Sequence, residues 1–311
     1  MDNTQANIIT KFIASLKGAV IHSEAPNELA FIKDSKNRAL QHEWLYHCTN
    51  ANALCSILKN REFWLTNLQQ VNDDNEANRI GAKEYENTFY VASFTYDPDI
   101  DENHWKEYGT IEDGVLVAVK NGWFNKKAFF FSKDGHIEDD FFKIYPSYDI
   151  AMKKKIEEQG NGRIINPFYI AAFGFYQVIY DDNLVKSIFS DSTMSMDDME
   201  LRGKSVIPEV AGIVKNKTGI CNRYGCVSYT KDWESEKEVR LKLRLHQLNH
   251  VRNGNELHDG MIMPVALRNI AVPLSKDAFE ELRIRFSPRF RNRNEYIKKI
   301  ESLYGIKVIE F

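Results

Sequence analysis

The stretch 238–245 alternates strictly between charged and apolar side chains. A β-strand turns successive side chains to opposite faces, so this alternation predicts a strand with one face in the core. The apolar positions are Val239, Leu241, Leu243 and Leu245, and the charged positions are Glu238, Arg240, Lys242 and Arg244. An edge strand with a solvated charged face is the simplest structure with this pattern.

Two glutamates, Glu236 and Glu238, stand two positions apart where this strand begins. If the strand starts at Glu236, both carboxylates lie on the same side of the sheet. Two adjacent carboxylates repel each other, which usually raises the pKa of one of them. The spacing therefore fits either a solvated charged face or a reactive carboxylate pair.

Composition indicates a soluble globular protein. The chain has 311 residues, enough for one large domain or two small ones, and 43% of them are hydrophobic and 27% charged. The net charge of −3 does not favour a nucleic-acid binder that is basic overall. Residues 1–5 lack the features of a signal peptide, and the most apolar run, 168–180, is too short to cross a bilayer. We therefore expect a cytoplasmic protein without membrane attachment.

The cysteine pattern bears on redox state and on metal binding. So few cysteines in a chain of this length indicate reduced thiols, as in the cytoplasm. The four are Cys48, Cys55, Cys221 and Cys226. Their spacing differs from the paired C-x-x-C ligands of zinc sites. A metal held by both pairs is an alternative, but the pattern favours no metal site.

Hydrophobic periodicity predicts one α+β domain. Helices are expected at 4–20, at 51–58, from the acidic loop 71–76 to about residue 87, around 153–158, in an insertion near 183–218 and at 292–303. Strands are expected at 44–49, 63–66, 89–95, 114–120, 128–132, 168–180 with a break at Gly174, 261–267, 270–274 and 306–311. A polar stretch follows the first helix. We expect a helical N-terminal extension over residues 1–43 and the main domain over residues 44–311.

Polar and aromatic residues follow the expected strands at positions where ligands are commonly bound. His47 and Thr49 end the first strand directly before a helix, and Ser93 stands near the end of another strand. His47 could offer a neutral ring nitrogen to a ribose hydroxyl. Trp105 and Tyr108 could stack on a flat ring. Taken alone, each residue is better explained by structure: His47 as a structural histidine, Ser93 as part of an ordinary strand end, and Trp105 or Tyr108 as a core aromatic.

Six short motifs occur in a fixed order along the chain. They are Leu45-Tyr46-His47-x-Thr49, Phe63-Trp64-Leu65-Thr66-Asn67, Asn72-Asp73-x-x-Glu76, Ser93-Phe94, Trp105-x-x-Tyr108-Gly109 and Trp233-x-x-Glu236-x-Glu238-x-Arg240. Together they resemble a widespread bacterial family, domain of unknown function 2971, which is met among phage-defence and toxin genes. The arrangement is more distantly similar to the toxins that ADP-ribosylate DNA. The resemblance covers roughly residues 44–275; Cys48 and Val239 depart from it by replacing aromatic positions, and neither change removes a candidate catalytic group.

The resemblance implies an ADP-ribosyltransferase-like mixed-sheet core and an NAD-dependent transferase. NAD would be the substrate, cleaved at its glycosidic bond through an oxocarbenium-like transition state. Glu238 would stabilise the developing positive charge, and Glu236 would act as general base toward the acceptor. His47 would bind a ribose, and Ser93 would support Glu238 or the nicotinamide pocket. The other predicted NAD contacts are Thr49, Tyr108 and Trp105, and no metal is required.

Charge near the C-terminus bears on the acceptor. Basic residues concentrate there, namely Arg283, Arg285, Arg289, Arg291, Arg293, Lys298 and Lys299. A protein that binds a phosphate backbone carries such a patch, which favours a nucleic-acid acceptor, RNA or DNA. A solvated helix face, with a protein as acceptor, is the alternative. The toxin or phage-defence setting also implies an antitoxin or regulatory partner.

Two other functions remain open at this point. A relative without transferase activity could bind a nucleotide or a partner protein. A metal-dependent nuclease could use Asp73, Asp74 and Glu76 together with the late glutamates, although their spacing is not that of a two-metal site.

Overall fold

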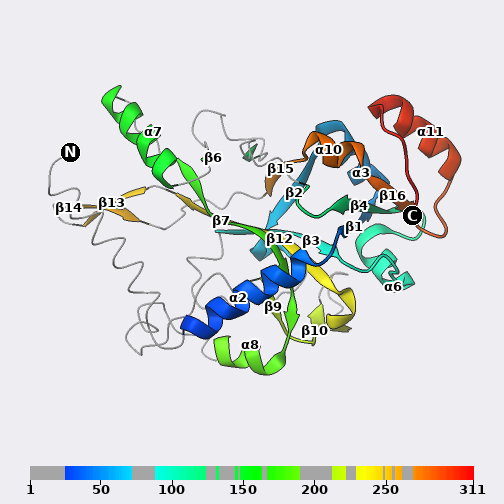
Figure 1. Ribbon diagram of the computed structural model, residues 1–311, viewed down its shortest axis with the longest axis horizontal. Helices are drawn as coiled ribbons and strands as arrows, with labels where there is room; N and C mark the ends of the chain where they lie inside the picture. Colours follow the sequence, from blue (N-terminus) through cyan, green and yellow to red (C-terminus); the bar gives the residue numbers. More distant parts are fainter. Residues whose placement is uncertain are drawn as a thin grey trace.

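The fold is described from a computed structural model of the chain. The described residues are 25–71, 88–123, 131–132, 144–145, 148–162, 167–189, 212–221, 229–247, 249–253, 256–260 and 269–311. Within them, helices alternate with strands along the chain, and most strands join one large mixed sheet (Figure 1). This confirms the α+β class. Three predicted elements, at 4–20, at 72–87 and at 261–267, lie outside the described residues.

One ten-stranded sheet organises the molecule. Its main path runs through β16 (Arg283–Phe286), β4 (Gly114–Lys120), β1 (Trp44–Asn50), β3 (Phe89–Thr95), β12 (Glu238–Gln247), β7 (Phe168–Gln177) and β6 (Ile144–Tyr145). A branch adds β2 (Glu62–Asn67) beside β3, then β15 (Asn269–Pro273) and β5 (Phe131–Ser132). The pairings are antiparallel except for β6 with β7. Smaller two-stranded sheets join β8 (Ile179–Tyr180) to β9 (Val214–Lys215), β10 (Thr218–Cys221) to β11 (Tyr229–Asp232), and β13 (Asn249–Asn253) to β14 (Glu256–Gly260).

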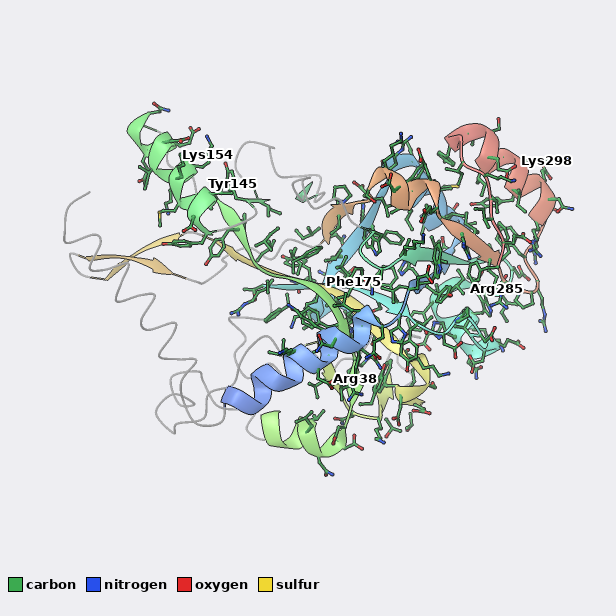
Figure 2. The ribbon with its side chains drawn as sticks, in the orientation of Figure 1. Arg38, Tyr145, Lys154, Phe175, Arg285 and Lys298 are labelled. Atoms are coloured by element: carbon green, nitrogen blue, oxygen red, sulfur yellow. The ribbon has the colours of Figure 1, made fainter. Side chains whose placement is uncertain are left out.

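Helices cover both faces of this sheet. On one face, α3 (Ala51–Asn60), α10 (Lys276–Glu280) and α11 (Arg293–Tyr304) bury apolar side chains in the main core, which also holds Phe175 of β7 (Figure 2). On the other face lie α2 (Ala25–Leu40), α8 (Asp182–Phe189) and β9 (Figure 1). Two helices remain among the described residues: α7 (Tyr148–Gly160) extends away from the main core (Figure 1), and the short α6 (Glu102–His104) leads into the helical turn η2 (Trp105–Gly109). No helix in the described ranges is long and apolar enough to cross a membrane.

Strand β12 lies in the middle of the sheet, between β3 and β7. Its apolar positions are fully buried in the main core, which confirms the predicted alternation. The expectation of a solvated charged face is wrong, because Glu238, Arg240, Lys242 and Arg244 are each at most 7% exposed. Buried charges need partners, and Lys242 and Arg244 find one in the ring of Phe89, whose centroid lies 4.5 Å and 5.3 Å from them.

Strand β3 changes partner along the edge that faces away from β12. It pairs with β1 at Thr95 and with β2 at Val91 and Tyr90. Residues 92–94 lie between these two described ladders. Because neither ladder covers residues 92–94, side chains and ligands can reach the backbone of β3 there. The change of partner therefore determines where a site can form.

Helix α2 is the largest described element that hydrophobic periodicity does not predict: it lies in the polar stretch that follows the helix expected at 4–20, within residues 1–43, where a helical N-terminal extension is expected. Its contacts with β7 explain the helix. Ala39 is fully buried, and the Ser35 hydroxyl donates a 2.7 Å hydrogen bond to the backbone oxygen of Gln177. Tertiary packing, which local periodicity does not report, stabilises this segment.

Three other expectations are corrected. Gly174 does not break its strand, since β7 continues through it and pairs it with Lys242. The insertion near 183–218 begins as α8, but residues 214–215 and 218–221 are strands, and residues 190–211 lie outside the described part. Residues 306–311, where a strand is expected, make only one isolated bridge, between Ile309 and Arg283.

Candidate active site

Two adjoining pockets lie where β3 changes partner, and residues of β1, β3 and β12 line both of them. The narrow pocket has a volume of about 70 Å³, and the wide pocket about 210 Å³. Both are lined by His47, Ser93, Tyr108, Glu236 and Glu238. The narrow pocket adds Tyr46, Phe94, Thr95 and His104, and the wide pocket adds Trp64, Thr66, Gln70, Lys215, Trp233 and Arg240. Five of the seven predicted site residues therefore come together from four separate segments.

Glu238 is the first residue of β12 and is 4% exposed. The Arg240 Nε–H donates a 2.7 Å hydrogen bond to its Oε1, and Lys215 Nζ lies 3.5 Å from its Oε2. Burial alone would raise the pKa of Glu238, but the charges of Arg240 and Lys215 outweigh burial and lower the pKa to about 2. A smaller contribution comes from the Ser93 hydroxyl. The raised pKa expected from repulsion between the two glutamates is thus wrong for Glu238, which is an anion at neutral pH.

The two oxygens of Glu238 are held differently. Oε1 accepts a hydrogen bond, whereas Oε2 is buried, has Lys215 Nζ 3.5 Å away, and accepts no hydrogen bond within the described residues. A buried charged oxygen without a hydrogen bond is unfavourable. Because Glu238 lines both pockets, a ligand hydroxyl or a water molecule can supply the missing hydrogen bond.

Glu236 lies outside the strand, in the short helical turn η4 (Glu234–Glu236). Lys237 follows it with a left-handed backbone, φ 49°, which turns the chain into β12. The two glutamates therefore reach the pockets through a turn, and not as neighbours on one strand face. The Tyr108 hydroxyl and Lys231 Nζ both donate to Glu236 Oε1, and Lys231 also binds Glu107.

The ring of Trp233 contacts two lysines of the site, the buried Lys215 and the half-buried Lys231. Lys215 Nζ and Lys231 Nζ lie 4.1 Å and 4.6 Å from the centroid of its ring, which is 1% exposed. Lys215 also stands 4.0 Å from Glu236 Oε2. The resulting network joins the carboxylates Glu107, Glu236 and Glu238 to the cations Lys215, Lys231 and Arg240. It is charge-balanced, which keeps Glu236 and Glu238 fixed in position.

His47 is held in one protonation state and one orientation. Its Nδ1 lies 2.9 Å from the backbone oxygen of Ser93, and because a carbonyl only accepts, Nδ1 carries the proton. Burial lowers the pKa of His47, so the ring is neutral. Phe63 and Phe94, with ring centroids 5.4 Å and 5.5 Å away, form its apolar surroundings. The remaining nitrogen, Nε2, is then an acceptor on a residue that lines both pockets.

Two predicted ligand contacts lie elsewhere. Trp105 is 5% exposed and packs against Gly109 and Gly114, where an added Cβ would come within 3.4 Å and 2.8 Å of its ring. Thr49 is 7% exposed and pairs with Val115 in the β1–β4 ladder. Neither residue lines the two pockets, and the packing of both supports the strand that carries His47.

Tyr108 does line the pockets, but its ring is already engaged. Lys231 Nζ lies 4.7 Å from its centroid, and the His104 ring 4.8 Å from it. Burial, followed by the nearby charges of Glu236 and Glu107, raises the pKa of Tyr108 well above its usual value. Its hydroxyl therefore stays protonated and donates to Glu236.

The sequence pattern missed Lys215 and Lys231 as site residues. Lys215 falls in the segment expected to be helical, and Lys231 precedes the Trp233 motif. Buried carboxylates require nearby cations, so their existence could be anticipated. Their positions could not, because they depend on how β9 and β11 fold over the sheet.

Three of the seven residues of the predicted basic patch form ion pairs with acidic neighbours. Arg285, Arg291 and Arg293 pair with Asp99, Glu112 and Glu310. Arg283 lies over the ring of Trp44, 4.1 Å from its centroid. Arg285 and Lys298 lie on the side of the molecule where the chain ends (Figure 2). The patch is therefore less positive than the sequence indicates.

Candidate metal ligands do not gather within the described ranges: no group of three or more His, Cys, Asp or Glu side chains there could hold an ion. Asp73, Asp74 and Glu76, which the nuclease hypothesis requires, lie outside those ranges. Comparison with known proteins adds no relative, because no family model, no curated protein and no solved structure matches the chain.

Proposed function

We propose that this protein is an NAD-dependent ADP-ribosyltransferase with Glu238 as the central catalytic residue. The observation that supports this most is the state of Glu238: a buried, ionised carboxylate that lines both pockets. Arg240 holds its Oε1 and Lys215 lies beside its Oε2, which accepts no hydrogen bond within the described residues. An anion held in this way suits a reaction that develops positive charge.

The chemistry follows from what each residue can do. When the bond between ribose and nicotinamide breaks, positive charge grows on the ribose ring. Glu238 would stabilise this charge and accept a hydrogen bond from a ribose hydroxyl through Oε2. The neutral Nε2 of His47 would accept a second ribose hydroxyl hydrogen bond. Because Arg240 and Lys215 hold the pKa of Glu238 at about 2, this carboxylate would not itself take up a proton near neutral pH.

Glu236 is suited to the acceptor step. Tyr108 and Lys231 hold its Oε1, so Oε2, which is 4.0 Å from Lys215, would receive the proton of the attacking acceptor group. The acceptor would thus approach from the side of Glu236. In this assignment Glu238 stabilises the charge on the ribose, and Glu236 takes the proton of the acceptor.

The arrangement of strands supports the resemblance on which the proposal also draws. His47, Ser93 and Glu238 stand on β1, β3 and β12, which are consecutive neighbours in the sheet. The predicted motifs are far apart in sequence, and five of the six contribute residues to the wide pocket; the sixth, at residues 72–76, lies outside the described residues. An ADP-ribosyltransferase core remains our proposal, as does a role as a toxin or phage-defence effector.

The acceptor we favour is a nucleic acid, RNA or DNA, with protein as the second choice. The ion pairs of Arg285, Arg291 and Arg293 reduce the electrostatic argument for a nucleic acid, so the experiment below compares both kinds of acceptor. An antitoxin or regulatory partner is part of the same proposal.

The test is to incubate the purified protein and NAD labelled in its adenylate half with cell extract, with and without a chelator. Label should enter a macromolecular fraction, remain there with chelator present, and be released by nuclease. Release by protease alone would move the acceptor to protein. No transfer, with no release of nicotinamide, would contradict the function.

A further inference from the structure

Trp64 is an exposed aromatic residue on an otherwise buried strand. Four other residues of β2, namely Glu62, Phe63, Leu65 and Asn67, are at most 8% exposed, whereas Trp64 is 44% exposed. Single exposed hydrophobic side chains are common on protein surfaces and need no explanation. Trp64 differs because it lines the wide pocket, which the other large exposed side chains, Leu40, Ile150, Ile156, Leu303 and Ile309, do not.

The indole ring of Trp64 is fixed before any ligand arrives. Its Nε1–H donates a 3.1 Å hydrogen bond to Oε1 of Glu62, which is itself 8% exposed. The strand is held by β15, with Trp64 opposite Ala271. A ring that is already ordered loses little entropy when another ring stacks on it.

Trp64 shares a face of the sheet with the site residues. Thr66 pairs with Val91, which in turn pairs with Lys242 of β12. Side chains two residues apart on a strand point to the same face, so Trp64 lies on the face that carries the charged residues of β12. The β2–β3 ladder ends at Thr66, so Trp64 lies beyond it, where the wide pocket forms, and it lines that pocket together with Glu236 and Glu238.

The size and polarity of the wide pocket limit what it accepts. Its volume is about 210 Å³. Pockets that enclose a whole ligand usually measure about 300–1,000 Å³, so this one suits a single ring with its sugar. Thr66 and Gln70 add polar groups beside the indole, which fits a ring with hydrogen-bonding edges better than a plain hydrocarbon.

We propose that Trp64 is the stacking platform of a nucleobase subsite in the wide pocket. Every nucleobase has a flat face that stacks on an aromatic side chain, whatever its hydrogen-bonding pattern. The base is either the adenine of NAD or a base of a single-stranded nucleic-acid acceptor. Naming these two sources rests on the proposed function, while the stacking itself rests on the geometry of Trp64.

The experiment compares the full-length wild type with Trp64→Ala and Trp64→Phe by calorimetric titration. Leu303→Ala, an exposed apolar change on α11, is the matched control. The probes are NAD, nicotinamide mononucleotide, which lacks adenine, and a short single-stranded DNA. Trp64→Ala should weaken binding of NAD or of DNA by about 5- to 150-fold, the effect of losing one base stack. Trp64→Phe should retain most of the affinity, and Leu303→Ala all of it.

The pattern of losses identifies the base. A loss with NAD and none with nicotinamide mononucleotide assigns the subsite to adenine, and a loss with DNA alone assigns it to the acceptor. Unchanged binding of both by Trp64→Ala, an equal loss with nicotinamide mononucleotide, or no binding of either by the wild type would overturn the proposal. A wild type that binds a probe through Trp64 but never releases nicotinamide from NAD would refute the transferase and leave the base subsite standing.

Discussion

Replacing Glu238 with Gln should destabilise the folded protein as well as impair the site. The change is nearly isosteric, but it removes the only charge on a side chain that is 4% exposed. Arg240, 2% exposed, would then keep a buried positive charge without its carboxylate, and Lys215 would lose its nearer anion. Removing one member of a buried ion pair is costly because the other charge stays desolvated.

The magnitude follows from the pKa of Glu238. In the folded protein the pKa falls from its ordinary 4.5 to about 2, a difference of 4.5 − 2, or about 2.5. Each pKa unit corresponds to ~1.36 kcal/mol, so the charge contributes about 3 kcal/mol to the free energy of unfolding near neutral pH. The typical cost of breaking a buried pair, about 3–5 kcal/mol, has the same size.

Urea unfolding of the wild type and Glu238→Gln between pH 7 and pH 3 measures this contribution. A carboxyl whose folded pKa is lowered stabilises the protein above its unfolded pKa and loses that effect as the pH falls through the folded pKa. The difference between the two proteins should therefore be constant above about pH 5 and shrink toward about pH 2.

A double-mutant cycle with Arg240→Met provides the control. The double variant should lose less free energy of unfolding than the two single variants do together. The reason is that neither Glu238 nor Arg240 is then left as a buried charge without the other. Equal stability of wild type and Glu238→Gln at pH 7, or a difference that does not change with pH, would refute the account of this ion pair.

Three further outcomes are expected. His47→Ala should weaken NAD binding by about 1–3 kcal/mol in a calorimetric titration; an unchanged affinity with a large fall in Tm would assign His47 a structural role only. Lys231→Met should lower the free energy of unfolding by about 1–3 kcal/mol in urea unfolding, since it removes the cation shared by the buried Glu236 and the half-buried Glu107, and adding Glu107→Gln should restore part of the loss. Arg289→Glu with Arg291→Glu should reduce transfer to nucleic acid, in a salt-dependent way, while NAD cleavage without acceptor stays unchanged; an unimpaired double variant with a flat salt response would favour a protein acceptor.

The sequence predicts best the features that depend on local alternation and composition. The strict alternation of β12 correctly predicts a strand with one face in the core. The order of the motifs along the chain is enough to select His47, Ser93 and the two glutamates as site residues. What the pattern could not show is that a second layer, made of α2, α8 and β9, covers the charged face of β12. That layer turns an apparently solvated row of charges into a buried network.

The missed parts share a physical reason. Helix α2 and the lysines Lys215 and Lys231 depend on contacts between segments that are far apart in the chain. Trp105 and Tyr108 stand three residues apart, yet one packs on glycines and the other lines the pockets. A spacing of this kind does not determine which side chain faces a ligand when the segment is a single irregular turn, here η2 (Trp105–Gly109).

The central claim is that Glu238 drives cleavage of the bond between ribose and nicotinamide. The direct measurement is release of nicotinamide from NAD by purified wild type and Glu238→Gln, without acceptor, at a temperature where circular dichroism shows both folded. Slow release by the wild type and none by the variant is the predicted result. Release at the same rate by both proteins, or by neither, would contradict the account.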